Sequence, residues 1–118
     1  MFQRYKERKY IKGVIKYVNE QIWNGKYARE KLRAIRENIR QNYDFHSEKL
    51  RGVTDGLKDM TNPEGKAQFE EQQTLLTTQV EQLRTNLTDW DAKIEAKGNE
   101  INGLRSELSM LTQYIGKI

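Results

Sequence analysis

Apolar residues recur every three to four positions along most of the chain, and the pattern is strongest in its second half. Alternating steps of four and three from Leu76 reach 13 positions, and 12 of these are apolar. The chain's apolar fraction of 36% would place only about five apolar residues among them. Such a sustained heptad pattern is typical of a helix that packs along another helix. The positions are Leu76, Val80, Leu83, Leu87, Trp90, Ile94, Lys97, Ile101, Leu104, Leu108, Leu111, Ile115 and Ile118.

The first half carries a second apolar series with the same spacing. Steps from Ile11 to Met60 reach 15 positions, of which 11 are apolar. This series predicts a first helix over about residues 3–60. The four exceptions interrupt the middle of the series, and they are Gly25, Arg29, Arg36 and His46.

One clear break separates the two series. The only proline, Pro63, disfavours the α conformation at Asn62, so a single continuous helix is not expected. Thr61 or Asn62 can cap a following helix, and proline fits its first turn. The sequence therefore predicts a turn at residues 61–65 and a second helix over about residues 64–117.

The two series match when the chain folds back at this turn. If residue n faces residue 126 − n, Ile11 faces Ile115, and Leu50 faces Leu76. The predicted fold is therefore all-α: an antiparallel coiled-coil helical hairpin of two long helices, forming a single domain over residues 1–118. Whether the hairpin also bundles with a partner or with another copy stays open.

The weakest layer of the predicted seam is the one in which Gly25 and Arg29 fall opposite Ile101 and Lys97. A glycine inside a helix costs about 1 kcal/mol relative to alanine. Two interpretations follow: a poorly packed, solvated layer, or a hinge at residues 24–26. Elsewhere in the seam, Arg36 falls opposite Trp90, which suggests stacking of the guanidinium on the indole. The lone His46 is interpreted as a tolerated seam residue.

Composition argues against catalysis. The chain has no cysteine, one histidine and no glycine-rich phosphate loop, and its acids fall on predicted exposed helix faces. We therefore expect no enzymatic activity, no cofactor, no metal site and no small-molecule substrate. Charged residues make up 32% of the chain, and there is neither a long apolar run nor a signal-peptide pattern. These features predict a cytoplasmic or virion-associated protein without a transmembrane segment.

Charge and aromatic residues concentrate near the N-terminus. Residues 1–40 hold 12 Lys and Arg against four Asp and Glu, whereas residues 41–118 hold nine against 13. A basic, aromatic amphipathic helix is typical of a docking surface. The candidate partner-binding residues are Arg4, Tyr5, Arg8, Lys9, Tyr10, Lys12, Lys16, Tyr17, Trp23 and Tyr27.

These features favour a structural or adaptor protein that acts through protein–protein contacts in a larger assembly, such as a phage particle or a secretion machine. Its partners would be other proteins or further copies of itself. Two alternatives are a nucleic-acid-associated protein that uses the basic N-terminal end, and a small regulatory or inhibitor protein that docks on a larger partner. Nucleic acid is the less favoured ligand because no nucleic-acid-binding motif is present, and a membrane surface is less favoured still.

Overall fold

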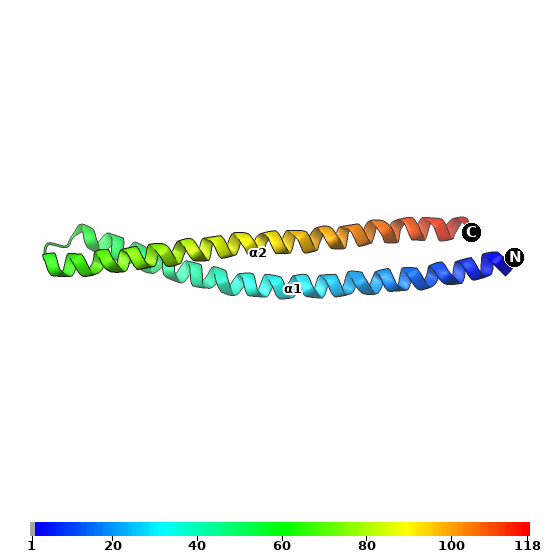
Figure 1. Ribbon diagram of the computed structural model, residues 1–118, viewed down its shortest axis with the longest axis horizontal. Coiled ribbons are helices and arrows are strands. Elements are labelled where there is room, and N and C mark those ends of the chain that lie inside the picture. The colour runs from blue at the N-terminus through cyan, green and yellow to red at the C-terminus, as the bar shows by residue number, and fades with distance from the viewer. Residues whose placement is uncertain (1) are drawn as a thin grey trace. The chain divides into compact units, whose positions relative to one another are not determined.

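Two long α-helices make up the fold. In the computed structural model, which describes residues 2–118 and only the backbone of Phe2, α1 spans Phe2–Lys58 and α2 spans Pro63–Lys117. Figure 1 shows the two helices running side by side in opposite directions. The prediction of an all-α antiparallel helical hairpin is confirmed.

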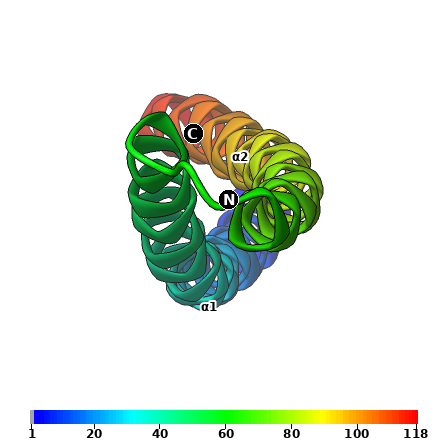
Figure 2. The same ribbon diagram turned by 90° about the vertical axis from the view of Figure 1, so that its left-hand side faces the viewer.

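Four residues, 59–62, connect the helices, and Figure 2 shows this linker facing the viewer. The predicted turn at 61–65 is corrected, because α2 already begins at Pro63. Asn62 caps the helix: its side-chain oxygen accepts a hydrogen bond from the backbone N–H of Glu64 at 3.0 Å. Proline at the first helical position has no N–H to leave unpaired. The cap and the proline together fix where α2 starts.

The helices pack within two compact units. Unit 1 combines Met1–Arg33 with Lys93–Ile118, and unit 2 is Ala34–Ala92. Unit 1 therefore contains the start of α1 and the end of α2, whereas unit 2 contains the linker and the helical segments on either side of it. Each unit has its own contacts between the two helices.

Unit 1 contains most of the buried core. Val18, Ile22 and Ile101 form its centre, and Ile101 is fully buried. Val18 and Ile22 are four positions apart, so their side chains leave α1 on the same side, toward α2. The core is completed by the partly buried residues Val14, Leu104, Leu108 and Leu111.

The layer around Gly25 is tightly packed, so the interpretation of a poorly packed, solvated layer is wrong. A Cβ atom built on Gly25 would lie 2.9 Å from Cγ1 of Ile101, closer than such atoms can approach. Ile101 therefore occupies the space that a side chain at position 25 would need. The pair also obeys the predicted register. Helix propensity measures only what a glycine costs its own helix and does not include the room that it leaves for a neighbour.

α1 remains helical through residues 24–26, and the suggested hinge there stays a prediction. One turn further along, Arg29 reaches across to α2: its Nη1 atom lies 4.0 Å from the Cβ position of Gly98. The Nε atom of Arg29 is buried without a hydrogen-bond partner among the described residues. A methyl group at Gly98 would make only an ordinary van der Waals contact with Arg29, so this glycine is not required for the long charged side chain at the seam.

Unit 2 is packed less deeply. Among the side chains that the structure describes, Val80 is the one buried apolar residue of this unit. A Cβ atom on Gly56 would lie 3.1 Å from Cε2 of Phe69, and Nε2 of Gln73 donates a hydrogen bond of 3.1 Å to Oγ1 of Thr54. Both pairs lie within one position of the predicted register, which therefore holds in this unit as well.

Candidate functional site

All ten residues predicted to bind a partner are exposed on α1. The aromatic members are the most informative, because large apolar side chains are usually covered. Tyr10 is 73% exposed and Trp23 is 70% exposed, and the remaining three aromatic members are exposed by 60% to 66%. Their surfaces are free because α1 uses other positions, among them Val18 and Ile22, to contact α2.

The ten residues do not share one face of the helix. An α-helix turns by about 100° per residue, so Tyr10 and Tyr17 lie almost above one another, whereas Trp23 lies about 120° further round. Arg4 is seven positions before Ile11 and therefore continues the line of the seam. The other seven residues follow a stripe of their own along α1. We call this stripe the basic–aromatic face, and it consists of Tyr5, Arg8, Lys9, Lys12, Lys16, Trp23 and Tyr27.

Two rings of the basic–aromatic face have a lysine beside them. Nζ of Lys26 lies 5.2 Å from the ring centroid of Trp23, and Nζ of Lys31 lies 4.6 Å from that of Tyr27. Such cation–π contacts contribute about 0.5–1 kcal/mol at exposed sites. They hold positive charge beside rings that remain open to a partner. The face can therefore offer flat apolar contact together with donors for carboxylate or phosphate groups.

The charge of the two units is opposite in sign. Unit 1 contains 14 Lys and Arg against six Asp and Glu, a net charge of +8, whereas unit 2 contains seven against 11, a net charge of −4. The basic–aromatic face lies entirely in unit 1. At its start there is a shallow depression lined by three cations and a ring, namely Tyr5, Arg8, Lys9 and Lys12.

A second exposed surface lies on the other side of the seam. The hydroxyl of Tyr114 on α2 donates a hydrogen bond to Glu7 on α1, one turn before Tyr10. This bond and the charge of Glu7 raise the pKa of Tyr114 above its ordinary value of 10.0. Met110, one turn from Tyr114 on α2, is 66% exposed. We call this surface the tyrosine flank, and it consists of Tyr10, Tyr17, Met110 and Tyr114.

Sequence reasoning missed the two members of the tyrosine flank that α2 contributes. Basic and aromatic residues are dense only in the first helix, so their density points to α1 alone. The predicted register contained the missing signal, because it puts Met110 level with Lys16, next to Tyr17. Reading both helices at the same level would have brought Met110 and Tyr114 into the candidate site.

The polar residues of the seam in unit 2 have local partners. Arg36 pairs with Asp91, with 2.7 Å between Nε and Oδ1, while its predicted stacking on Trp90 stays a prediction. His46 donates a hydrogen bond from Nδ1 to the backbone carbonyl of Asn42 at 2.8 Å. This bond turns one ring nitrogen toward its own helix. Within residues 2–118, no group of His, Asp and Glu could hold a metal ion.

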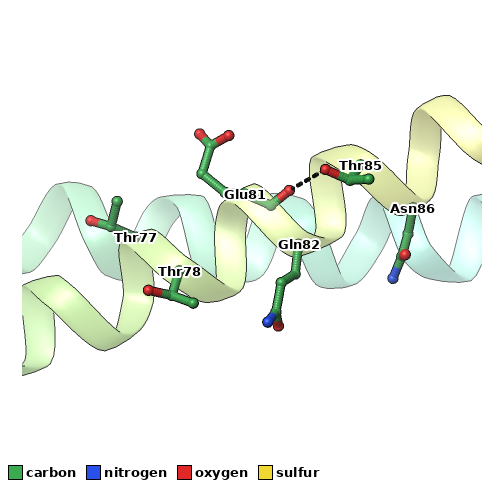
Figure 3. A pocket seen from close by; sticks show the side chains of 6 residues that line it. All are labelled: Thr77, Thr78, Glu81, Gln82, Thr85 and Asn86. Atoms are coloured by element: carbon green, nitrogen blue, oxygen red, sulfur yellow. Dashed lines mark hydrogen bonds between the residues drawn. The ribbon is translucent and has the colours of Figure 1, made fainter.

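Two further depressions lie in unit 2. The larger, shown in Figure 3, follows the surface of α2 alone and contains the hydrogen bond of 3.1 Å from the Thr85 hydroxyl to the Glu81 carbonyl. The hydroxyl is thus bound to its own helix and does not point at a substrate site. Elsewhere in this unit, a hydrogen bond from Arg40 lowers the pKa of Glu37. This shift keeps the carboxylate ionised, unlike the raised pKa of a general acid.

Comparison with protein-family models, curated proteins and solved structures finds no match to this chain. Neither helix, over the residues described, contains a stretch apolar enough to cross a membrane. A proposal on function therefore rests on the geometry of the hairpin and on its two exposed surfaces.

Proposed function

We propose that this chain is a structural or adaptor protein that works without catalysis, cofactor or metal. It holds a partner protein with an acidic surface against the basic–aromatic face, within a larger assembly such as a phage particle or a secretion machine. The hairpin serves as the rigid support, and unit 1 provides the contact.

The exposure of Trp23 within the basic–aromatic face carries this proposal. Tryptophan is enriched among the residues that dominate protein interfaces, where its loss costs about 2 kcal/mol or more. In the free chain Trp23 is 70% exposed and has Lys26 beside its ring. The aliphatic and aromatic parts of the face can contact apolar groups, while its cations match carboxylates. A partner with acidic residues around an apolar pocket fits both properties.

A matched pair of substitutions tests the proposal. Trp23→Ala removes the largest ring of the face, whereas Phe45→Ala removes a ring in unit 2 that is 58% exposed against 70% for Trp23 and has Lys49 Nζ 5.3 Å from its centroid. Each variant serves as bait for proteins of the native host, with the retained proteins quantified. We expect Trp23→Ala to lose the partner and Phe45→Ala to keep it. Equal retention by both variants would place the interface elsewhere.

Nucleic acid is the second candidate, favoured by the net charge of +8 on unit 1. Titration of the full chain with duplex DNA of random sequence at increasing salt distinguishes it. Binding through phosphate contacts weakens steeply with salt, with a slope of about −0.9 for each phosphate neutralised. Tight binding with such a slope, lost on Lys12→Glu but kept on Lys66→Glu, would favour this second function over the adaptor.

A further inference from the structure

The tyrosine flank is wider than a seam between two helices requires. Val14 on α1 and Leu111 on α2 pack against the buried cluster and remain half-buried. Beyond them, Tyr10, Tyr17 and Met110 are 73%, 60% and 66% exposed. A two-stranded seam uses only two positions of each heptad, whereas a helix in a larger bundle adds a third. On this side, unit 1 therefore has the pattern of a helix pair with a further neighbour.

The tyrosine flank offers area for such a neighbour. At about 200 Å² for a large side chain, the exposed parts of the four flank residues supply roughly 500 Å². Each partner contributes roughly 800 Å² to a standard interface. The flank alone thus provides over half of one partner's share.

Charge decides which face of unit 1 can meet a second copy, because each unit 1 carries a net charge of +8. The cations of the basic–aromatic face, among them Lys9, Lys12 and Lys16, follow a separate stripe of α1, roughly 120° round the helix from Tyr10 and Tyr17. The carboxylate of Glu7 on the flank is already bonded to Tyr114. Two copies that meet through their tyrosine flanks keep their cationic faces apart. Contact through the basic–aromatic faces would instead bring like charges together.

We propose that a second copy of this chain docks on the tyrosine flank, so that two copies of unit 1 form a four-helix bundle. The neighbour must present an apolar helical stripe of matching spacing, and each copy carries one. A two-fold arrangement makes the contact self-complementary and closed. Gly13 lies one turn from both Tyr10 and Tyr17, and no described atom beyond its own helix backbone lies within 4 Å of its Cβ position. A side chain of the other copy can enter between the two rings.

This dimer is separate from the proposed function, because it uses a different stripe of α1 and leaves the basic–aromatic face free. Sedimentation equilibrium of the full chain over a wide concentration range tests it. We expect a mass twice the 14.0 kDa of one chain, with a dissociation constant in the micromolar range or below. A mass of one chain at every concentration up to about 100 μM, well above that range, would overturn the proposal.

Lysine substitutions locate the interface. Tyr17→Lys and Met110→Lys place a charge in the contact from α1 and α2 respectively, and each should raise the dissociation constant by about tenfold or more. Tyr27→Lys is the matched control, since Tyr27 is 66% exposed on the basic–aromatic face against 60% for Tyr17 on the flank. Circular dichroism verifies that each variant stays helical. A dimer that withstands both flank substitutions, or that Tyr27→Lys weakens equally, would refute this interface.

Discussion

Replacing Gly25 by alanine separates two opposing effects of a glycine inside a helix. Alanine has the higher helix propensity by about 1 kcal/mol, so the substitution stabilises α1 wherever the new methyl group finds space. At Gly25 that methyl group would lie 2.9 Å from Cγ1 and 3.6 Å from Cδ1 of the fully buried Ile101. Overpacking of this kind costs about 1–3 kcal/mol. We therefore expect Gly25→Ala to lower the free energy of unfolding by about 0–2 kcal/mol.

Gly52→Ala is the matched control. Gly52 lies in the same helix, and among the described residues nothing outside its own helix backbone comes within 4 Å of its Cβ position. Its substitution should raise the free energy of unfolding by about 0.5–1 kcal/mol. Urea denaturation followed by far-ultraviolet circular dichroism, at one fixed protein concentration, measures both variants.

A double substitution tests the cause directly. Ile101→Ala alone should cost about 2–5 kcal/mol, because it leaves a cavity in the core of unit 1. In that background the methyl group of Gly25→Ala enters the vacated space, so the same substitution becomes stabilising. A Gly25→Ala substitution that is as stabilising as Gly52→Ala in the wild-type background would refute this packing role of Gly25. The glycine would then serve a purpose other than packing, such as the hinge suggested by the sequence.

Three further predictions concern single contacts of the hairpin. Cysteines at Leu50 and Leu76 should form a disulfide within one chain under mild oxidation, whereas cross-linking only between chains would contradict the register within unit 2. Asn62→Ala removes the cap of α2 and should cost about 1 kcal/mol in urea denaturation, with an unchanged stability arguing against the cap. The raised pKa of Tyr114 means that its hydrogen bond to Glu7 contributes stability below pH 10.0 that is lost as the pH rises through the folded-state pKa. Glu7→Gln should therefore lower the titration midpoint of Tyr114 in a site-resolved NMR experiment, and an unchanged midpoint would exclude the coupling.

The fold could be predicted from the sequence because a helical hairpin repeats one simple rule along its length. Apolar spacing located the helices, Pro63 located the linker, and the matching of the two series gave the register that Gly25 and Ile101 confirm. Helix ends were placed only to within a few residues, since they depend on capping bonds such as that of Asn62.

The candidate site was less predictable. The exposure of residues such as Trp23 follows from their positions outside the seam, but their division into two surfaces depends on the angle between side chains around α1. The contribution of Met110 requires both helices to be considered together. Fit between neighbours, as between Gly25 and Ile101, depends on distances that composition and spacing do not contain.

Contacts near the linker join residues that are close in the sequence, whereas contacts in the core of unit 1 join distant ones, and this difference predicts an order of folding. Gly56 and Phe69, near the linker, are 13 positions apart along the chain, whereas Gly25 and Ile101 are 76 positions apart. Closing the longer loop from the unfolded chain costs about 1.6 kcal/mol more in chain entropy. The hairpin is therefore expected to close at the linker first and to zip toward its ends, with its deepest packing formed last. Substitutions at Ile101 should then speed unfolding and leave the refolding rate almost unaltered. The core of unit 1 would thus set how slowly the hairpin unfolds, and not how fast it forms.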